Sequence, residues 1–282
     1  MTNTPQNYSQ CSAKPEPSQS RHGHSTHLVV IDALNLIRRI DGALRGFKNQ
    51  GSLDKEQLIG LTKQALSKLI RGHQPTHIAA VFDGDGNNWR KQLYPEYKAN
   101  RKPMDPSLAA LLPEIIQQWQ QLGVMSLTTA HEEADDLIAT LSYKVTKHQG
   151  RCTVVSTDQG FYQLLPLGVA IWDHFAGHWI NQQNIQQKFS ISAIQLLDYW
   201  AIVGQSGNKI PGVAGMGPKA ALTILKQHQD LKTAFSITQG QDKQLLKLQQ
   251  NKHQAQLSYQ LVRLKQNISL GINLQQLRYT AK

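Results

Sequence analysis

Acidic residues are scarce in this chain. It has 19 Asp and Glu against 30 Lys and Arg in 282 residues, which gives a formal net charge of +11. The shortage is greatest after Asp158, where twelve Lys and Arg stand against four acids, Asp173, Asp198, Asp230 and Asp242. A protein this basic most often binds nucleic acid, because Lys and Arg displace the counterions of phosphate groups. The alternative is a basic soluble enzyme with no nucleic-acid partner.

Cysteine and long apolar runs are scarce too. Cys11 and Cys152 are too few for a disulfide framework and suit a reducing cytoplasm. No apolar run reaches the ~18 residues that a membrane span needs. Residues 1–26 are polar, contain Pro15 and Pro17, and lack the apolar core of a signal peptide. We therefore expect a cytoplasmic protein and no membrane partner, with a disordered tail at residues 1–26.

Short apolar runs alternate with segments of helical spacing from residue 27 onward. Strands are expected at residues 28–31, 77–82, 124–127, 152–157 and 169–172. Helices are expected at residues 53–71, at 107–121 and from the acidic stretch 131–136 to about residue 148, and the chain looks helical after residue 191. This alternation predicts an α/β fold with a mainly parallel sheet and helices on both faces.

Carboxylates lie at the ends of three predicted strands. Asp32, Asp83 and Asp158 each close a predicted strand, and the acidic stretch 131–136 opens the helix after another strand. Ligands of parallel sheets bind at the carboxyl ends of the strands, so we expect four chain segments to bring carboxylates to one rim. These candidate ligands are all oxygens, which suits Mg²⁺ or Mn²⁺ and not zinc.

The acidic stretch also has a simpler interpretation. Acids in the first turn of a helix are stabilised by the helix dipole, here with Thr128 or Thr129 as a possible cap. That effect accounts for one or two of them. Glu133 and Asp136 lie three residues apart on one helix face, where they repel each other unless a cation lies between them. The pair therefore favours a metal site.

A long connection at residues 84–106 mixes basic and aromatic side chains. They are Trp89, Arg90, Lys91, Tyr94, Tyr97, Lys98, Arg101 and Lys102. Such a mixture suits an element that grips a nucleic-acid strand, because rings stack on bases and cations pair with phosphates. A connection this long within a compact domain is usually functional or disordered. A solvated surface loop is the alternative.

A glycine-rich stretch at residues 210–219, with the sequence IPGVAGMGPK, joins two predicted helices. Glycine lets the backbone come close to a ligand, and Pro218 suits the first position of the second helix. The free amides of that helix start would face a phosphate, with Lys219 beside it. We interpret the stretch as a hairpin that grips the DNA backbone without reading bases. An ordinary turn is the alternative.

These segments together resemble the bacterial flap endonuclease family, which includes the 5′-nuclease domain of DNA polymerase I. The matching sequences, in family order, are VIDALNL (30–36), VFDG (81–84), YKANRKPM (97–104), EADD (133–136), STD (156–158) and IPGVAGMG (210–217). The resemblance implies an α/β catalytic domain at residues 27–189, with a helical arch at 84–106. It implies a helical region at 190–282, whose residues 190–228 form a helix-three-turn-helix DNA clamp.

The resemblance also implies roles for single residues. Mg²⁺ would be bound directly by Asp135 and, directly or through water, by Glu133, Asp136 and Asp158. The catalytic residues would be Asp32, Asp83, Lys98 and Arg101. A K⁺ ion in the clamp would be held by the backbone carbonyls of Ile202, Val203, Pro211, Val213 and Met216. The DNA contacts would be Arg90, Gly215, Met216, Gly217, Pro218, Lys219 and Ala220.

Three positions depart from the family pattern. Gly160, Gln205 and Asn208 stand where the family has carboxylates of a second metal site. The loss resembles the divergent branch called exonuclease IX, or Xni-type flap endonucleases. We therefore expect one firmly held Mg²⁺ and a second ion that is bound weakly or through water.

The leading hypothesis is a Mg²⁺-dependent, structure-specific 5′-flap endonuclease. It would hydrolyse phosphodiester bonds in branched or flap DNA with a 5′ single-stranded end, during replication or repair. A DNA-junction-binding protein with weak or lost catalysis stays open because of the missing carboxylates. An RNA-cleaving nuclease of related sheet topology is a third alternative, against which the glycine hairpin argues.

Overall fold

The computed structural model describes residues 26–48, 54–84, 88–129, 131–238 and 242–281. The tail expected at residues 1–26 therefore lies outside the described residues, apart from Thr26. Among the helices in these ranges, none combines the length and the apolar character needed to cross a bilayer.

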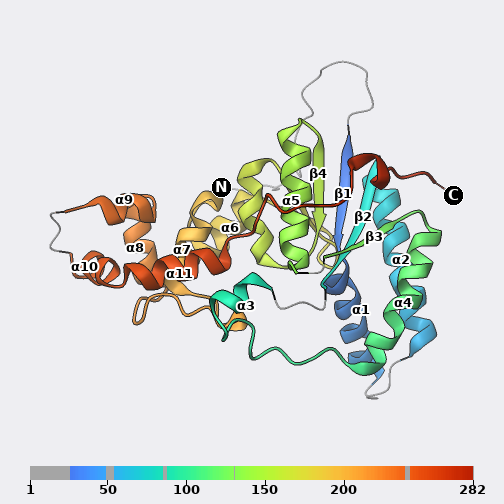
Figure 1. The fold of residues 1–282 in the computed structure, drawn as a ribbon, viewed down its shortest axis with the longest axis horizontal. Helices are drawn as coiled ribbons and strands as arrows, with labels where there is room; N and C mark the ends of the chain where they lie inside the picture. Colours follow the sequence, from blue (N-terminus) through green and yellow to red (C-terminus); the bar gives the residue numbers. More distant parts are fainter. Residues whose placement is uncertain (1–25, 49–53, 85–87, 130, 239–241, 282) are drawn as a thin grey trace, which may run out of the picture.

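A six-stranded sheet forms the centre of the larger part of the molecule (Figure 1). Its strands are β1 (His27–Asp32), β2 (His77–Phe82), β3 (Met125–Thr128), β4 (Arg151–Val155), β5 (Ala170–Asp173) and β6 (His178–Ile180). Their order is β3-β2-β1-β4-β5-β6; β1 to β5 are parallel, and β6 runs antiparallel to β5. The mainly parallel sheet predicted from the sequence is confirmed. The short strand β6 was not expected, because it has three residues and buries one of them.

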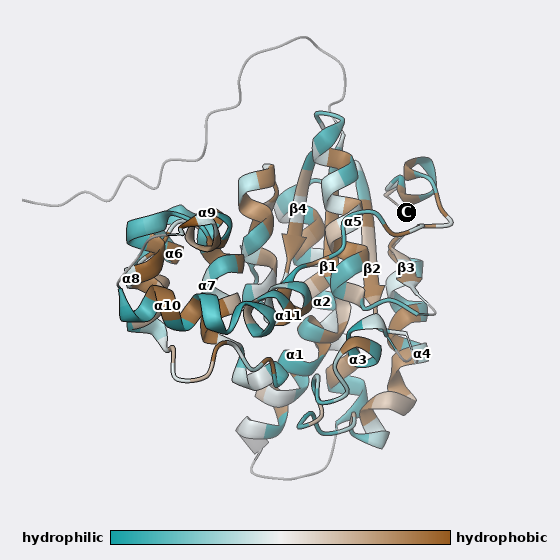
Figure 2. Ribbon diagram, turned by 60° about the vertical axis from the view of Figure 1, so that its left-hand side comes forward, coloured by the Kyte–Doolittle hydropathy of each residue, from teal (hydrophilic) through white to brown (hydrophobic). Residues whose placement is uncertain are grey.

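Helices cover both faces of the sheet, as the alternation predicted (Figure 1). One face packs against α1 (Ala33–Lys48), α2 (Lys55–His73) and α4 (Pro106–Gln121), and the other against α5 (Ala134–Lys147). Alternate residues of β1 pack into the cores on the two faces of the sheet, since successive side chains of a strand point to opposite faces. All six residues of β1 are therefore buried, and its central residues 28–31 form a continuous apolar run. Figure 2 shows hydrophobic residues concentrated in these central strands.

The C-terminal part is helical, as expected, and has a core of its own. It contains α6 (Gln182–Phe189), α7 (Leu196–Val203), α8 (Pro218–His228), α9 (Leu231–Ser236), α10 (Lys243–Gln250) and α11 (Lys252–Val262). Trp200, Ile224 and Leu248 are buried among these helices, and Tyr97 of the long connection joins the same core. That connection contains the short helix α3 (Trp89–Leu93). Because Tyr97 is buried in the core of the helices, the long connection is packed against the helical part.

The chain returns to the α/β part after α11. Residues 264–277, here called the returning segment, include the 3₁₀ turn η4 (Leu274–Leu277). Leu264, Ile268 and Leu277 pack in the same core as α5. Figure 1 shows this dark red segment crossing in front of α5. The last part of the chain is thus folded against the helix that carries the acidic stretch.

Candidate active site

The structure brings the four acidic segments to one rim of the sheet. Asp32 is the last residue of β1, Asp83 follows β2, and Asp158 lies just beyond β4. Because β1 pairs in parallel with both β2 and β4, these strand ends are neighbours. Asp83 Oδ1 accepts a hydrogen bond of 2.9 Å from the amide of Ala134, which fixes the start of α5 at the same rim.

The helix that follows the acidic stretch begins later than the sequence indicated. Its N-cap is Glu133, without a side-chain capping bond, so neither Thr128 nor Thr129 caps it. Asp135 and Asp136 then occupy the first turn. The hydroxyl of Thr129 instead donates to the carbonyl of Glu132.

Asp32 is a buried carboxyl group, with 8% of its surface exposed. It accepts hydrogen bonds from the hydroxyl of Ser156 (2.8 Å) and the amide of Asn35 (3.2 Å). Burial raises the pKa of Asp32 to about 7, and the charges of Asp158 and Asp83 add to this effect against the two hydrogen bonds. Ionised Asp32 is therefore costly at this rim unless a cation is near.

Asp135 is the acid of α5 that stays accessible, with 27% of its side chain exposed. Burial raises the pKa of Asp135 well above its usual value, and the charges of Asp158 and Asp32 add to this, while Lys98 opposes it. The acids at this rim therefore repel one another. A divalent cation bound there would relieve that repulsion.

The carboxylates do not by themselves form a closed metal cage. Across the described ranges, no three His, Cys, Asp or Glu side chains are grouped closely enough to hold one ion. Asp158 Oδ1 is engaged in capping the 3₁₀ helix η1 (Gln159–Leu167), since it accepts a 2.7 Å hydrogen bond from the amide of Gly160. Residues Asp32, Asp83, Asp135 and Asp158 could therefore hold an ion with water completing its shell, as Mg²⁺ commonly requires.

A guanidinium lies where the sequence predicted a metal ion. Arg90 Nη1 is 2.5 Å from Glu133 Oε2 and 2.8 Å from Asp136 Oδ2, and Nη2 is 2.8 Å from Asp136 Oδ1. Asp136 also accepts bonds from Trp89 Nε1 (3.0 Å) and from the amide of Lys265 (2.8 Å). Asp136 is completely buried. Both of its oxygens already have partners, and its role as a metal ligand stays a prediction.

Arg90 itself is 1% exposed, and the DNA contact expected of its side chain stays a prediction. Its Nε and Nη2 donate to the carbonyls of Leu261 and Arg263, both at 2.8 Å. Lys265 Nζ in turn lies 3.0 Å from Glu132 Oε1. No sequence pattern indicated these contacts, since Arg90 and Leu261 are 171 residues apart.

Glu133 connects this buried ion cluster to Lys98. Its Oε1 lies 2.5 Å from Lys98 Nζ, and its Oε2 accepts a bond of 3.1 Å from the hydroxyl of Tyr97. Lys98 Nζ is then 3.9 Å from Asp135 Oδ2. Burial alone would lower the pKa of Lys98, but Asp135 and Glu133 raise it above its usual value. Lys98 is thus a fixed, protonated cation beside the accessible acid.

The long connection is bonded to the turn that precedes the glycine-rich stretch. The amide of Lys98, a residue with a left-handed backbone (φ 56°), donates to the carbonyl of Asn208 at 2.9 Å. Arg101 Nη2 donates to Asn208 Oδ1, also at 2.9 Å, and Arg101 remains exposed. The two predicted catalytic cations, Lys98 and Arg101, are therefore both bonded to Asn208, one of the positions that depart from the family pattern.

The positions without family carboxylates lie beside the rim. Asp158, Gly160 and Gln205 line one cleft of about 560 Å³ between the α/β part and the helical part. Asn208 Nδ2 donates to Gln205 Oε1 at 2.9 Å. A Cβ added at Gly160 would lie 3.1 Å from Asp158 Oδ1. Neutral groups thus occupy the part of the rim where a second ion would need acids.

The glycine-rich stretch is a tight hairpin. Gly204 and Gly212 have positive φ angles of 77° and 65°, and a Cβ at Gly212 would lie 2.5 Å from the nitrogen of Gly204. The amide of Val213 donates to the carbonyl of Ile202 at 2.7 Å, and the amide of Met216 donates to the carbonyl of Val213 at 3.0 Å. Each carbonyl oxygen keeps a second lone pair.

The start of α8 is open, as the sequence indicated. Gly217 is its N-cap and offers no side-chain acceptor, and Pro218 and Lys219 are exposed. Met216 is buried, so only its backbone is available to a ligand. Lys247 of α10 adds a cation that the sequence did not single out: its Nζ donates to the carbonyl of Gly215 at 3.3 Å.

The chain matches two family models over most of its length. Residues 27–190 match the 5′-3′ exonuclease, N-terminal resolvase-like domain, and residues 191–282 match the 5′-3′ exonuclease, C-terminal SAM fold. Curated relatives named flap endonuclease Xni include one from Psychromonas ingrahamii, 45% identical over 90% of this chain and 97% of the relative. A second, from Shewanella oneidensis, is 44% identical over 89% of this chain and 94% of the relative.

Solved structures share the fold at lower sequence identity. The T5 D15 protein co-crystallised with metal ions superposes with a TM-score of 0.69 and 18% identity, covering 84% of this chain and 88% of the other. The catalytic core of Rad2 in complex with DNA superposes with a TM-score of 0.55 and 13% identity, covering 86% and 81%. Taken with the carboxylate rim and the glycine hairpin, the two model matches show that the chain belongs to the 5′-3′ exonuclease family.

Proposed function

We propose that this chain is a Mg²⁺-dependent, structure-specific 5′-flap endonuclease acting on branched DNA with a 5′ single-stranded end, in replication or repair. The observation that carries the proposal is the position of Lys98. Glu133 holds its ammonium group 3.9 Å from Asp135, at the rim where Asp32, Asp83 and Asp158 also end. The name of the curated relatives, flap endonuclease, supports the same activity.

Asp135 would bind Mg²⁺ directly, because it is the accessible acid of α5. Asp32, Asp83 and Asp158 would bind it directly or through water, and Glu133 would act through Lys98. When bound, the ion would activate a water molecule and stabilise the charge that develops on the scissile phosphate. The raised pKa values of Asp32 and Asp135 support this assignment, since a cation at the rim would offset the repulsion between the acids.

Lys98 and Arg101 would orient the scissile phosphate and stabilise its developing negative charge. Both are fixed to the carbonyl or side chain of Asn208, so they present a preorganised pair of cations. Residues 84–106 would form the arch under which the 5′ end passes. Arg90 would connect the start of the arch to Glu133 and Asp136, with which its guanidinium is hydrogen-bonded; a DNA contact by its side chain stays a prediction.

The hairpin and the start of α8 would bind the phosphate backbone of duplex DNA. The proposed contacts are Gly215, Met216, Gly217, Pro218, Lys219 and Ala220, the buried Met216 through its backbone. A K⁺ ion would be held by the carbonyls of Ile202, Val203, Pro211, Val213 and Met216. The domain limits that go with this assignment are residues 27–189 and 190–282, and we infer a cytoplasmic location from the proposed DNA substrate.

A second candidate is a flap-binding protein with weak or lost catalysis. Gly160, Gln205 and Asn208 favour it, because they leave the second half of the rim without acids. A single experiment separates the two functions. Cleavage of a 5′-labelled flap substrate is measured across Mg²⁺ concentrations, with Asp135→Asn as the control. Mg²⁺-dependent cleavage that the variant lacks supports the nuclease, and binding without cleavage at every Mg²⁺ level supports the second candidate.

A further inference from the structure

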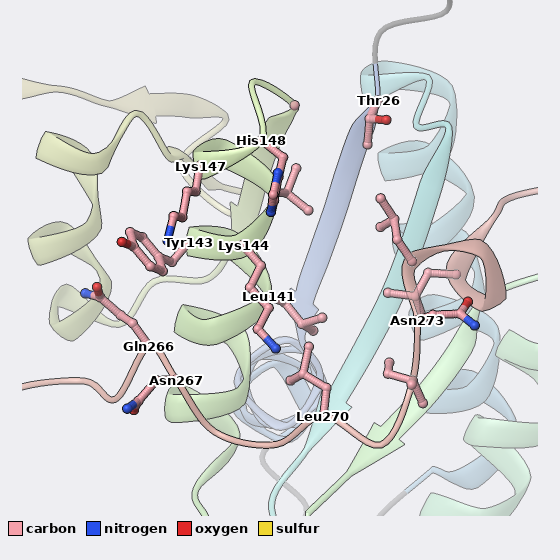
Figure 3. Close-up of a pocket in the computed structure, with 15 residues that line it drawn as sticks. Thr26, Leu141, Tyr143, Lys144, Lys147, His148, Gln266, Asn267, Leu270 and Asn273 are labelled. Atoms are coloured by element: carbon pink, nitrogen blue, oxygen red, sulfur yellow. The ribbon is translucent and has the colours of Figure 1, made fainter.

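A groove of about 610 Å³ lies between the second half of α5 and the returning segment (Figure 3). Thr26, which immediately precedes β1, lines it, so the groove is at the amino end of that strand. The carboxylate rim is at the opposite end. The 14 residues of α5, which starts at the rim, span about 20 Å at 1.5 Å per residue. A molecule in the groove would therefore leave the rim accessible.

Aliphatic side chains form the floor of the groove. Leu141 and Val145 of α5 belong to the buried core. Leu270 and Ile272 of the returning segment are only half-buried, and Leu274 is 37% exposed. A concave surface that leaves neighbouring aliphatic side chains partly open is typical of a site that binds an apolar group.

The border of the groove is basic. Lys144 and Lys147 lie in the last turn of α5, followed by His148, and Figure 3 shows the three side chains along one edge. Both lysines are exposed, and neither forms an ion pair with a described acid. No described Asp or Glu lines the groove. Two unpaired cations beside an aliphatic floor select for a ligand that is both acidic and apolar.

From this combination we propose that the groove docks a short acidic segment of a partner protein. A bulky apolar side chain of that segment enters the floor between α5 and Ile272. Its carboxylates pair with Lys144 and Lys147, which supplies orientation and charge complementarity. The proposal is independent of the proposed nuclease activity, because none of these residues belongs to the rim.

Two other occupants fit less well. The chain's own residues 1–25 contain one acid, Glu16, against Lys14 and Arg21, and have no Val, Ile, Leu, Phe or Trp. They complement neither the basic border nor the aliphatic floor. Duplex DNA would satisfy the two lysines, but its sugar-phosphate backbone has no aliphatic group that would fill the floor.

The test uses the full chain and a phage-displayed library of random 12-residue peptides. Enriched peptides are synthesised with a fluorescein label and titrated by fluorescence anisotropy. We expect sequences with two or more acids beside a large apolar residue. The double variant Lys144→Glu/Lys147→Glu and the single variant Ile272→Asp should each weaken binding at least tenfold. Thermal melting and flap cleavage show whether each variant remains folded.

A charge-matched control removes the effect of net charge. Lys55→Glu/Lys243→Glu alters two exposed lysines at the starts of α2 and α10, where the helix dipole tolerates an acid. This variant should bind the peptides as the parent chain does. The proposal is overturned by any of three results: no enriched acidic–apolar sequence, equal weakening in the control, or a duplex DNA that binds the groove lysines in preference to the peptides.

Discussion

The guanidinium of Arg90 and the carboxylate of Asp136 form a buried two-point ion pair, with both N–O distances at 2.8 Å. Ion pairs without access to water are sensitive to the loss of one partner, because the other is left as an uncompensated charge. The same guanidinium holds Glu133, which in turn holds Lys98. Arg90 in the long connection and the candidate catalytic lysine are thus connected through side chains that are at most 11% exposed.

Replacing Arg90 with lysine tests whether it positions the site or contacts DNA. Lysine keeps the charge but loses the two-point geometry, so Arg90→Lys should lower the free energy of unfolding by about 1–3 kcal/mol. Cleavage should fall, whereas the salt dependence of DNA binding should stay unchanged. The exposed neighbour Lys91 provides the control Lys91→Ala, with stability unaffected. A reduced salt slope for Arg90→Lys would show that the arginine reaches phosphate after all.

The repulsion at the rim predicts a stability effect at Asp32. Its folded pKa of about 7 lies above the usual value of 3.8, so its contribution to stability is complete below pH 3.8 and is lost as the pH rises toward 7. Asp32→Asn should therefore raise the unfolding free energy above pH 7 without divalent metal, by about 2 kcal/mol allowing for relaxation. The gain should vanish near pH 4.

Thermal melts in EDTA between pH 4 and 8 measure this effect. Asp41 gives the control, since it forms an ion pair of 2.8 Å with Arg45 and Asp41→Asn should not stabilise the fold. Mg²⁺ should stabilise the parent chain more than Asp32→Asn. If the two melt alike at pH 8 in EDTA, the acids at the rim do not repel one another as described.

Asp135→Asn should abolish or greatly weaken cleavage while leaving flap binding intact. The variant removes the accessible acid beside Lys98, and the hairpin of residues 210–219 is a separate part of the molecule. Single-turnover cleavage and anisotropy of a labelled flap substrate give the two readings. Cleavage at the parental rate would exclude Asp135 as the principal metal ligand.

Backbone binding by the hairpin predicts steep salt sensitivity without sequence preference. The logarithm of affinity should fall linearly with the logarithm of salt concentration. Lys219→Ala should make that slope shallower by about 1 and weaken all flap sequences alike, whereas Lys55→Ala, far from the hairpin, should leave it unchanged. Strong discrimination among flaps of equal shape would contradict a backbone clamp.

Much of the α/β architecture could be predicted because β1 is buried on both faces and its residues 28–31 form an unbroken apolar run. Because parallel strands end at the same edge of the sheet, the common rim of Asp32 and Asp83 could be predicted as well. Helix α1 was not expected, although Leu36, Ile37, Ile40 and Leu44 have helical spacing and are buried. Polar residues between these apolar positions make the helical spacing harder to recognise in the sequence.

The partner of Glu133 and Asp136 could not be derived from spacing. Sequence periodicity correctly indicated that a cation must lie between the two acids, but an arginine and a metal ion satisfy that requirement equally. The choice depends on contacts at long range: Arg90 is 46 residues from Asp136 and 171 from Leu261. Only the packing of the returning chain against α5 decides it.

The last prediction concerns the part of the rim that lacks acids. Restoring carboxylates with Gly160→Asp, Gln205→Asp and Asn208→Asp together should raise cleavage and lower the Mg²⁺ concentration it requires. Gly160 and Gln205 line one cleft with Asp158, and Asn208 bonds to Gln205, so the new acids would face a shared volume. They could then hold the second ion that we expect the parent chain to bind only weakly or through water.

Each single variant should do little or do harm. A Cβ at position 160 would lie 3.1 Å from Asp158 Oδ1, which would disturb the acid that caps η1. An acid at 208 would keep the bond from Arg101 but draw that cation away from the phosphate. One carboxylate also cannot replace the tightly held water shell of Mg²⁺. The gain should therefore be non-additive, as for residues that act as a unit.

Single-turnover flap cleavage against Mg²⁺ concentration, for the parent chain, each single variant and the triple variant, measures this gain. Folding is checked by thermal melting, and DNA binding is measured in Ca²⁺. A triple variant that folds and binds DNA but cleaves no faster at any Mg²⁺ level would mean that the acids at Asp32, Asp83, Asp135 and Asp158 already support all the cleavage this rim allows. A gain confined to the triple variant would indicate that weak binding of the second ion limits cleavage in the parent chain.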